Sequence, residues 1–282
     1  MAQVRCDLSI VTVVLNDKVG LEKTIKSVQN QESIQIEHII VDGGSADGSA
    51  SLAARHSSIP LESKKDGGIY PAMQRGADVA TGKYILFCNA GDLIFGREYL
   101  AHSLAILKKV DGQWGYGPII EYTERDTYAW VPASVAPTSE TIIARKDFVP
   151  FPSFIIKHEL LQQLGGFSRK YKIAGDFELI CKAARASDPV VFSEPIALFA
   201  AGGISYTQAD LAWREEISIR REILQLNQSQ MLKESIKYFS RLTRWRIGKV
   251  LDKIQERSLK STISWRDRRA HKVPEEYISI LN

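Results

Sequence analysis

Short polar side chains that could bind a ligand together stand in the loops between apolar segments in the first third of this 282-residue chain. They are Asn16, Asp42, Asp66, Asn89 and Asp92. Carboxylate and amide oxygens accept hydrogen bonds, and a carboxylate at a strand end can hold a divalent cation against a diphosphate. Each residue alone is more often a turn or cap residue, so the chemistry depends on whether the fold brings the five together.

The elements that carry these residues repeat the order strand, polar loop, helix. Apolar runs of strand length predict strands at 8–15, 36–41 and 84–88. Helical patterns follow at 21–28 and 50–54, and a third helix starts near Pro71 and ends at Gly82. Consecutive units of this kind imply a parallel sheet with right-handed crossovers, and open sheets bind ligands where their strands end. The polar residues are therefore expected to meet in one crevice.

Four segments together resemble the nucleotide-sugar half of the inverting family 2 glycosyltransferases, whose fold is called GT-A. They are Ser9–Asn16, Ile40–Gly48, Asp66–Tyr70 and Ala80–Asp92. The resemblance covers roughly residues 7–205 and implies an α/β GT-A fold with a mostly parallel central sheet.

By this resemblance the crevice holds a nucleoside-diphosphate-sugar donor. Asp42 would hydrogen-bond the donor's base, and Asp66 and Gly68 would lie beside the nucleoside. Asn16, which ends the first strand, would complete this part of the donor site. The sequence leaves open whether the base is uracil or guanine.

The same resemblance makes Asp92 a ligand of Mg²⁺ or Mn²⁺ on the diphosphate. The family's metal motif usually carries more than one Asp in this stretch, whereas Asn89 and Gly91 stand at two of those positions here. A cation that keeps several waters needs only one or two carboxylates plus substrate phosphates. Metal use is therefore still expected, with weak affinity before the donor binds, and Asn89 would contribute hydrogen bonds to the donor.

Asp176 begins a helical pattern in the second half of the chain, with Phe177 and Ile180 in its apolar stripe. An Asp at a helix start is more often a cap than a catalyst. The segment nevertheless resembles the family's Gly-Gly-Phe stretch followed by an Asp-aromatic-Glu-Leu helix, which implies that Asp176 is the general base for the acceptor hydroxyl. Gly175 departs from this pattern, because many relatives carry an acid there.

The resemblance implies an enzyme of polysaccharide biosynthesis that moves one sugar, with inversion, from the donor to a glycan or lipid-linked acceptor. The Gln-x-x-Arg-Trp pattern of processive polysaccharide synthases does not occur in the chain, which favours single transfers. The alternative from another class is a non-catalytic nucleotide-sugar-binding or scaffold protein of a polysaccharide assembly complex, because the metal motif is thinned. A dinucleotide-dependent oxidoreductase is disfavoured, since no Gly-x-Gly-x-x-Gly follows the first strand.

The composition and the positions of the cysteines indicate which class of protein this is and which cellular compartment it occupies. A hydrophobic content of 44% without a low-complexity tract is typical of a folded domain. Cys6, Cys88 and Cys181 are too scattered for a disulfide framework or a metal knuckle, which favours a reducing compartment. Residues 1–5 show no signal-peptide pattern, and no apolar run reaches the ~18 residues of a spanning helix, so we expect a cytoplasmic enzyme.

The pattern of elements changes near residue 207. We expect a GT-A catalytic domain over 1–206, divided into a nucleotide-sugar half at 1–95 and an acceptor half at 96–206. Residues 207–282 form a helical C-terminal extension in this division.

Two long helical patterns occupy the extension, 208–226 and 231–254, and the second is a basic amphipathic helix. One interpretation is a surface helix packed on the catalytic domain. The other is that 229–272 docks on an anionic membrane, which would place the enzyme peripherally on the inner face of the cytoplasmic membrane beside a lipid-linked acceptor. Nucleic acid is not an expected partner, because no recognition fold is present and the net charge is only +4.

Overall fold

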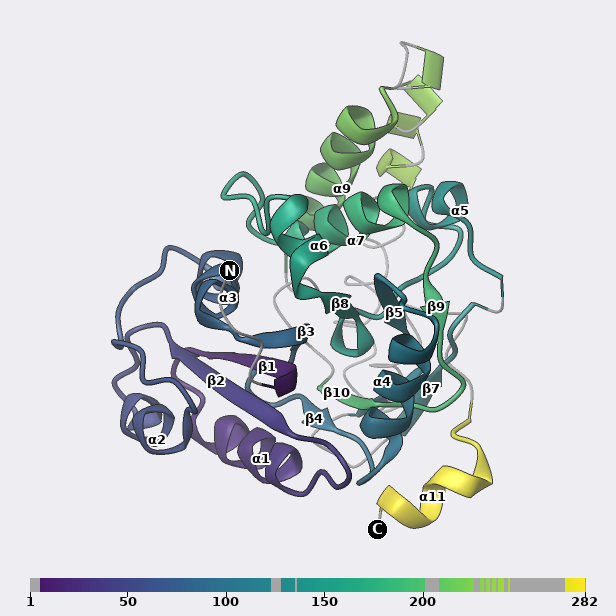
Figure 1. Ribbon diagram of the computed structural model, residues 1–282. Coiled ribbons are helices and arrows are strands. Elements are labelled where there is room, and N and C mark those ends of the chain that lie inside the picture. Colours follow the sequence, from purple (N-terminus) through teal and green to yellow (C-terminus); the bar gives the residue numbers. More distant parts are fainter. Residues whose placement is uncertain are drawn as a thin grey trace, which may run out of the picture.

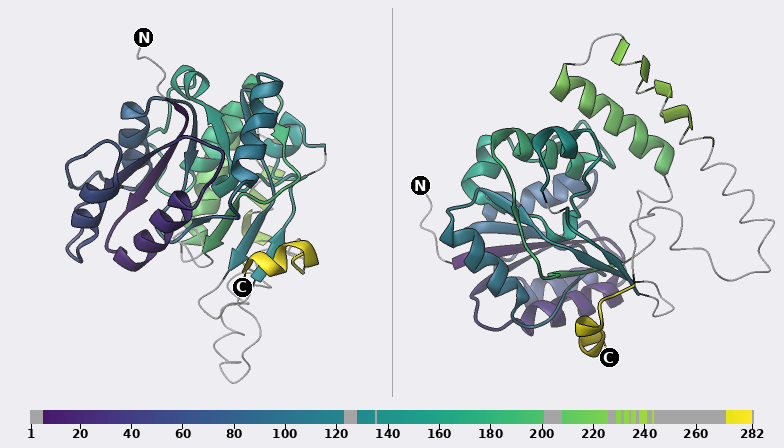
Figure 2. Two further views of the ribbon diagram at one scale, coloured as in Figure 1. Left: turned by 60° about the horizontal axis from the view of Figure 1, so that its bottom comes forward. Right: turned by 90° about the vertical axis from the view of Figure 1, so that its right-hand side faces the viewer.

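Two β-sheets and the helices that flank them make up the described part of the chain (Figures 1 and 2). The computed structural model describes residues 6–122, 128–134, 136–200, 208–225, 229–230, 232–233, 235–236, 238–240, 243 and 272–281. The first sheet carries the strands that the sequence predicts, and the second begins directly after Asp92.

The first sheet has six strands in the order β2-β1-β3-β8-β5-β9. Their bounds are β1 (Cys6–Val14), β2 (Ile36–Asp42), β3 (Gly82–Phe87), β5 (Trp114–Tyr116), β8 (Ile155–Lys157) and β9 (Val190–Val191). β1 pairs in parallel with β2 and β3, and β5 with β9, whereas β8 runs antiparallel to β3 and β5. The three predicted strands and the mostly parallel sheet are confirmed.

The helices of the described residues alternate with these strands. They are α1 (Lys18–Gln29), α2 (Ser49–His56), α3 (Ile69–Val79), α4 (Tyr99–Lys109), α5 (Ser139–Ile143), α6 (His158–Gln163), α7 (Gly175–Ala186), α9 (Ala209–Leu224) and α11 (Glu275–Leu281), with a 3₁₀ turn η1 (Phe151–Ser153). The sequence predicts α1, α2, α3, α7 and α9 from their apolar spacing, and α9 ends two residues before its predicted limit.

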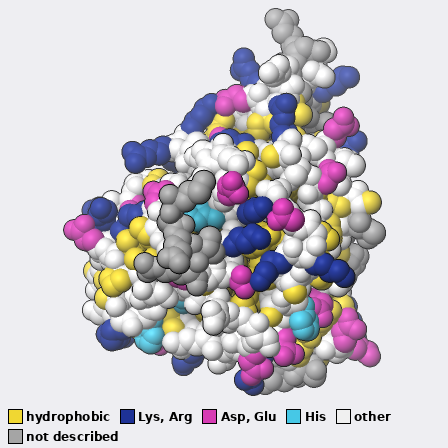
Figure 3. All heavy atoms as spheres, viewed as in Figure 1, with side chains coloured by type: hydrophobic (Ala, Val, Ile, Leu, Met, Phe, Trp, Pro, Cys, Tyr) yellow, Lys and Arg dark blue, Asp and Glu magenta, His cyan; other side chains and the backbone are white. Residues whose placement is uncertain are grey.

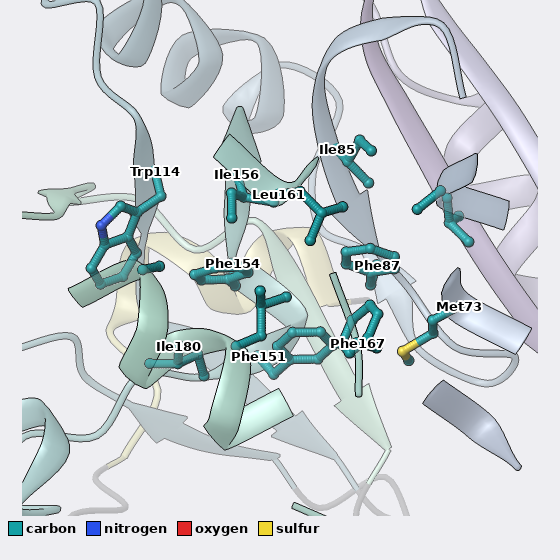
Figure 4. Packing of buried hydrophobic residues seen from close by; sticks show 14 of the residues in the cluster. Met73, Ile85, Phe87, Trp114, Phe151, Phe154, Ile156, Leu161, Phe167 and Ile180 are labelled. Carbon is teal, nitrogen blue, oxygen red and sulfur yellow. The ribbon is translucent and has the colours of Figure 1, made fainter. Parts of the chain in front are cut away.

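β1 is buried on both faces, which explains why its sequence is a continuous apolar run. Val11 and Val13 belong to a core that continues through α3, η1, α6 and α7. Leu8 and Ile10 point to the other face, where they belong to a cluster that includes Leu100 and Leu104 of α4. Figure 4 shows the first core between the two halves, with aromatic rings from β3, η1 and the segment after α6 in contact. The predicted nucleotide-sugar and acceptor halves therefore share one core.

A second sheet, which the sequence analysis does not predict, joins the two halves near the candidate site. Its order is β4-β10-β6-β7, with bounds β4 (Leu93–Ile94), β6 (Ile119–Tyr122), β7 (Tyr128–Val131) and β10 (Ala197–Ala200). β10 pairs antiparallel with β4 and parallel with β6. Strands of two to four residues carry too few alternating positions to be recognised from sequence.

α9 and α11 pack on upstream elements, at opposite ends of the molecule (Figures 1 and 2). Ile219 of α9 packs against Phe177 and Cys181 of α7. Tyr277 of α11 stacks on Trp130 of the second sheet, with ring centroids 5.4 Å apart. The predicted boundary at 206–207, and residues 244–271 of the predicted extension, lie outside the described residues.

Two glycines mark close backbone contacts between the first elements. Gly82 does not end α3 as predicted, because the helix ends at Val79 and Gly82 begins β3. A Cβ at Gly82 would lie 2.5 Å from the backbone N of Ser9, so glycine is needed where β3 meets β1. Gly76 of α3 lies against the sheet, and a Cβ there would approach Val11 Cγ1 to 2.4 Å.

We expect Gly76→Ala to destabilise the protein by about 1–3 kcal/mol, because overpacking of a filled core outweighs the better helix propensity of Ala. Asp78→Ala is the matched control, since Asp78 is exposed in the same helix. Urea unfolding of both variants measures the difference. A Gly76→Ala variant at least as stable as the parent would show that α3 can move away from the sheet freely.

Candidate functional site

A pocket of about 1610 Å³ opens where β1 and β3 end, between the two halves of the fold. Its lining includes six of the seven residues predicted as site residues: Asn16, Asp66, Gly68, Asn89, Asp92 and Asp176. Asp42 lies beside the pocket, and its neighbours Gly43 and Gly44 line it. The structure thus brings the predicted residues together, while their individual roles stay predictions.

Asn16 joins the loop after β1 to the loop after β2. Its backbone N–H donates to Ser45 Oγ at 2.8 Å, and its Oδ1 accepts from the Ala46 N–H at 2.9 Å. Asn16 has a positive φ of 52°, a conformation that Asn adopts more readily than most residues. The side chain therefore holds the shape of the pocket wall.

Asp42 ends β2 and organises the glycine-rich turn that follows it. Its Oδ1 accepts hydrogen bonds from the N–H groups of Gly44 and Ser45, both at 3.0 Å, and from Ser63 Oγ. Burial opposes ionisation, but the hydrogen bonds from Ser45, Ser63 and Gly44 prevail and lower the pKa of Asp42. Oδ2 of Asp42 is buried and has no hydrogen-bond partner among the described residues. That oxygen is therefore a buried acceptor whose hydrogen-bonding capacity the described residues leave unused.

Asp66 is held by Arg75, a residue that the sequence analysis does not single out. Nε of Arg75 lies 2.7 Å from Oδ1 of Asp66, and Nη2 donates to Oδ2 at 2.8 Å. The same guanidinium donates to the carbonyl oxygens of Glu62 at 2.6 Å and Asp42 at 3.0 Å. Arg75 thus ties three segments around the pocket with one planar group. The only sequence signal for it is a long cation within a helix whose face is otherwise small and apolar.

Asp92 is almost completely buried, with 4% of its surface exposed, at the junction of the two sheets. Its Oδ1 accepts from the Ala200 N–H of β10 at 3.1 Å. Burial raises the pKa of Asp92 to about 7, although hydrogen bonds from Ala200 and Asn89 act in the opposite direction. A cation beside this carboxylate would favour its charged form, because opposite charge lowers a carboxyl pKa.

The oxygens of Asp92 and Asn89 are of the type that Mg²⁺ or Mn²⁺ binds, but the described residues do not form a complete metal site. Among the described residues, no group of three or more His, Cys, Asp or Glu side chains could bind a metal ion. Oδ1 of Asn89 is buried and has no hydrogen-bond partner among the same residues, and it lines the pocket beside Asp92. Carboxylate and amide oxygens suit Mg²⁺ or Mn²⁺, and the remaining ligands would be water and phosphate.

Asp176 lies in the first turn of α7 but is not its N-cap, because Ala174 occupies that position without a side-chain cap. Oδ1 of Asp176 accepts from the Phe177 N–H at 2.8 Å and from Tyr70 Oη at 3.1 Å. Burial raises the pKa of Asp176, and the guanidinium of Arg145 partly offsets the effect. A buried carboxylate with a raised pKa that faces a pocket is suited to accepting a proton.

Tyr70 explains why glycine precedes Asp176. A Cβ at Gly175 would lie 2.7 Å from Cδ2 of Tyr70, so the ring fills the space that a larger residue would need. Tyr70 also stacks on Phe167, with ring centroids 5.5 Å apart. The aromatic ring therefore occupies the space that a side chain at residue 175 would need, and its hydroxyl lies 3.1 Å from Oδ1 of Asp176.

α9 contributes to the pocket, although the sequence analysis assigns it to an extension. Gln208 precedes the helix, and Ala212, Trp213 and Glu216 lie within it; all four line the pocket. Glu216 forms an ion pair with Arg145, which also lines the pocket. The wall near Asp176 is thus built partly from residues after 207.

Comparison with known proteins identifies the family. The sequence model named Glycosyl transferase family 2 matches residues 9–165, more than half of the chain. The uncharacterized glycosyltransferase Rv1514c of Mycobacterium tuberculosis is 30% identical over 203 residues, which are 70% of this chain and 76% of that protein. The PGL/p-HBAD biosynthesis glycosyltransferase Rv2957 of the same species is 24% identical over 213 residues, 72% of this chain and 80% of that protein.

Solved structures show the fold. S. aureus TarS 1–349, in complex with UDP-GlcNAc, superposes with a TM-score of 0.61 at 15% identity, over 82% of this chain and 73% of that one. The mannosyltransferase PcManGT of Pyrobaculum calidifontis, in complex with GDP-Man and Mn²⁺, superposes with a TM-score of 0.58 at 15% identity, over 84% and 72% of the two chains. The predicted GT-A fold is confirmed, and the chain belongs to glycosyl transferase family 2.

Proposed function

We propose that the protein is an inverting, metal-assisted glycosyltransferase that moves a single sugar from a nucleoside-diphosphate donor to a hydroxyl of a glycan or lipid-linked acceptor. One observation carries the proposal: Asp92 and Asp176, which come from the two halves of the fold, line the same pocket. Family membership supports the reaction class. The pocket is large enough for a donor and an acceptor group together.

The donor site is the part of the pocket formed by the loops after β1, β2 and β3. The buried, unpartnered Oδ2 of Asp42 supports recognition of a base N–H, and Asp66, fixed by Arg75, supports the neighbouring wall. TarS binds UDP-GlcNAc and PcManGT binds GDP-Man with Mn²⁺. These two donors are therefore the first to test.

Asp92 and Asn89 are the residues that would hold Mg²⁺ or Mn²⁺. A bound cation would neutralise negative charge on the leaving diphosphate. Asp92 is the only carboxylate of these two residues, since Asn89 carries an amide. The affinity for the metal should therefore be weak until the donor phosphates add their oxygens as ligands.

Asp176 would take the proton of the acceptor hydroxyl. The acceptor oxygen forms its bond to the anomeric carbon on the face opposite the diphosphate, and the bond from that carbon to the diphosphate oxygen breaks. The bonding electrons leave with the nucleoside diphosphate, the proton ends on Asp176, and the anomeric configuration is inverted. Tyr70, which donates to Asp176 at 3.1 Å, would hold the carboxylate in place.

The sparse metal ligands favour one alternative, a nucleotide-sugar-binding or scaffold protein without catalysis. The two functions differ in donor turnover. Incubation of UDP-GlcNAc or GDP-mannose with the protein and Mn²⁺ should release UDP or GDP if the protein is an enzyme, because water can replace the acceptor. A protein that binds either donor without releasing nucleoside diphosphate, even with added acceptor glycans, would support the scaffold role.

We also propose that 229–272 contacts an anionic membrane. Leu232, Ile236 and Phe239 recur at helical spacing, and each has 60–63% of its surface exposed. Most of the basic residues of this segment lie outside the described residues. Acidic and basic side chains of the described residues are interspersed on the face shown in Figure 3. Among the described residues, no helix is long and apolar enough to cross a bilayer.

We expect Asp92→Ala to abolish Mn²⁺-dependent donor binding and nearly all turnover, because Asn89 and Gly91 supply no substitute carboxylate. Isothermal titration with UDP-GlcNAc or GDP-mannose, with and without Mn²⁺, measures the effect. Asp188→Ala is a control, because Asp188 is an exposed carboxylate that does not line the pocket. A variant at Asp92 that keeps the affinity and metal dependence of the parent would refute the metal role.

Asp176→Asn keeps the size of the side chain but removes its basicity. The kcat should fall by about 10²- to 10⁴-fold with donor affinity unchanged. In the parent, turnover should rise as the pH rises through the pKa of Asp176, because only the ionised base accepts a proton. This rise should occur above the ordinary Asp pKa of 3.8, because burial raises the pKa of Asp176. Ordinary transfer rates in a folded Asp176→Asn variant would rule out the assignment.

Flotation with phosphatidylcholine vesicles, with and without phosphatidylglycerol, tests the membrane contact. The intact protein should float with the anionic vesicles and lose this binding at high salt, because exposed charge is screened. Phe239→Ser should weaken it, since Phe239 is exposed on the apolar face. Equal recovery with both vesicle types, or recovery with neither, would favour a segment that packs on protein.

A further inference from the structure

A carboxylate from α9 holds the backbone that leads into α7. Oε1 of Glu215 accepts from the Lys172 N–H, and Oε2 accepts from the N–H groups of Ile173 and Ala174, all at 2.9 Å. Glu215 is buried, with 9% of its surface exposed. Hydrogen bonds to an ionised acceptor are roughly twice as strong as neutral ones, so three of them fix this short segment firmly.

The segment that Glu215 holds ends two residues before Asp176. Ala174 is the N-cap of α7 and has no side-chain oxygen that could cap the helix. Glu215 instead binds the N–H groups of the residues that lead into the helix, up to the N-cap itself. The carbonyl oxygen of Ile173 accepts from Tyr70 Oη at 2.5 Å, and the same hydroxyl lies 3.1 Å from Asp176. The segment is therefore held on its N–H side by α9 and on its carbonyl side by α3.

The next residue of α9 reaches the other side of the helix start. Glu216 pairs with Arg145, and the Arg145 guanidinium lies 4.2 Å from the ring centroid of Phe177. Of these two adjacent carboxylates of α9, Glu215 binds the backbone before Asp176 directly, and Glu216 is linked to Phe177 only through Arg145. Glu215 acts on Asp176 through the backbone that it binds. Glu216 acts through its pairing with Arg145 and through its negative charge, which raises the pKa of Asp176.

We infer that Glu215 is a positioning residue for the general base: by binding three consecutive backbone N–H groups, it fixes the start of α7 and hence the place of the Asp176 carboxylate in the pocket. The inference rests on the proposed role of Asp176. It gives α9 a part in the reaction, although Glu215 touches no reacting atom.

The test compares Glu215→Gln with Glu222→Gln. Glu222 lies on the same helix and contacts the side chains of Lys170 and Tyr171, but none of the three N–H groups. An amide at 215 places N–H groups against backbone donors, so Glu215→Gln should lower the kcat for release of UDP or GDP by about 10- to 100-fold, as expected for a misplaced catalytic group. Donor affinity by titration should stay unchanged, and Glu222→Gln should behave as the parent.

A double variant separates positioning from general destabilisation. In an Asp176→Asn background, Glu215→Gln should cause little further loss of activity, because the base whose place it sets is already gone. A purely structural role would lower activity by the same factor in both backgrounds and would overturn the inference. If Glu215→Gln is not recovered folded, Glu215→Asp, which keeps the charge but shortens the side chain, replaces it in the same comparison.

Amide hydrogen exchange adds a readout that does not depend on activity. The N–H groups of residues 172–174 should exchange faster in Glu215→Gln than in Glu222→Gln, while the loops around Asp92 stay unchanged. If Asp176→Asn is inactive but Glu215→Gln shows unaltered exchange or an unaltered kcat, the inference about Glu215 is wrong and the proposed function still holds. An active Asp176→Asn variant would overturn the proposed function, and the inference with it.

Discussion

The parallel pairing of β1 with both β2 and β3 is the constraint on which the candidate site depends. Parallel strands end on the same side, so Asn16, Asp42 and Asn89 reach one edge of the sheet because β1 aligns with β2 over seven residue pairs and with β3 over five. The alignment requires close backbone approach at Gly82, where a Cβ would lie 2.5 Å from Ser9. A change in this register would separate the loops that form the donor side of the pocket.

Burial disfavours the charged form of each of the three carboxylates near the pocket, and their surroundings offset this effect to different extents. Asp42 receives several hydrogen bonds, and its pKa is lowered. Asp92 receives fewer, and burial raises its pKa to about 7. Burial also raises the pKa of Asp176, although Arg145 and Tyr70 favour its charged form. The difference matches the tasks we propose: fixed recognition at Asp42, a charge completed by a cation at Asp92, and proton acceptance at Asp176.

The wall of the pocket around Asp176 depends on contacts between distant parts of the chain. α7 carries Asp176, but Tyr70 of α3, Arg145 after α5 and two glutamates of α9 surround its first turn. The second sheet adds Ala200, whose N–H fixes Asp92. The helix α9 is therefore part of the structure around Asp176.

The sequence by itself determined the first three strands and their helices, because continuous apolar runs and helical spacing are local patterns. It also determined that the polar loops converge, because parallel strands place the loops that follow them at one edge of the sheet. Only the tertiary structure decided that Arg75 holds Asp66, that Tyr70 fills the space above Gly175 and that Glu215 binds residues 172–174. The last contact joins residues 41–43 positions apart, and the second sheet joins strands of two to four residues. Such contacts leave no period in the sequence, because they arise from packing between elements rather than from the conformation of one.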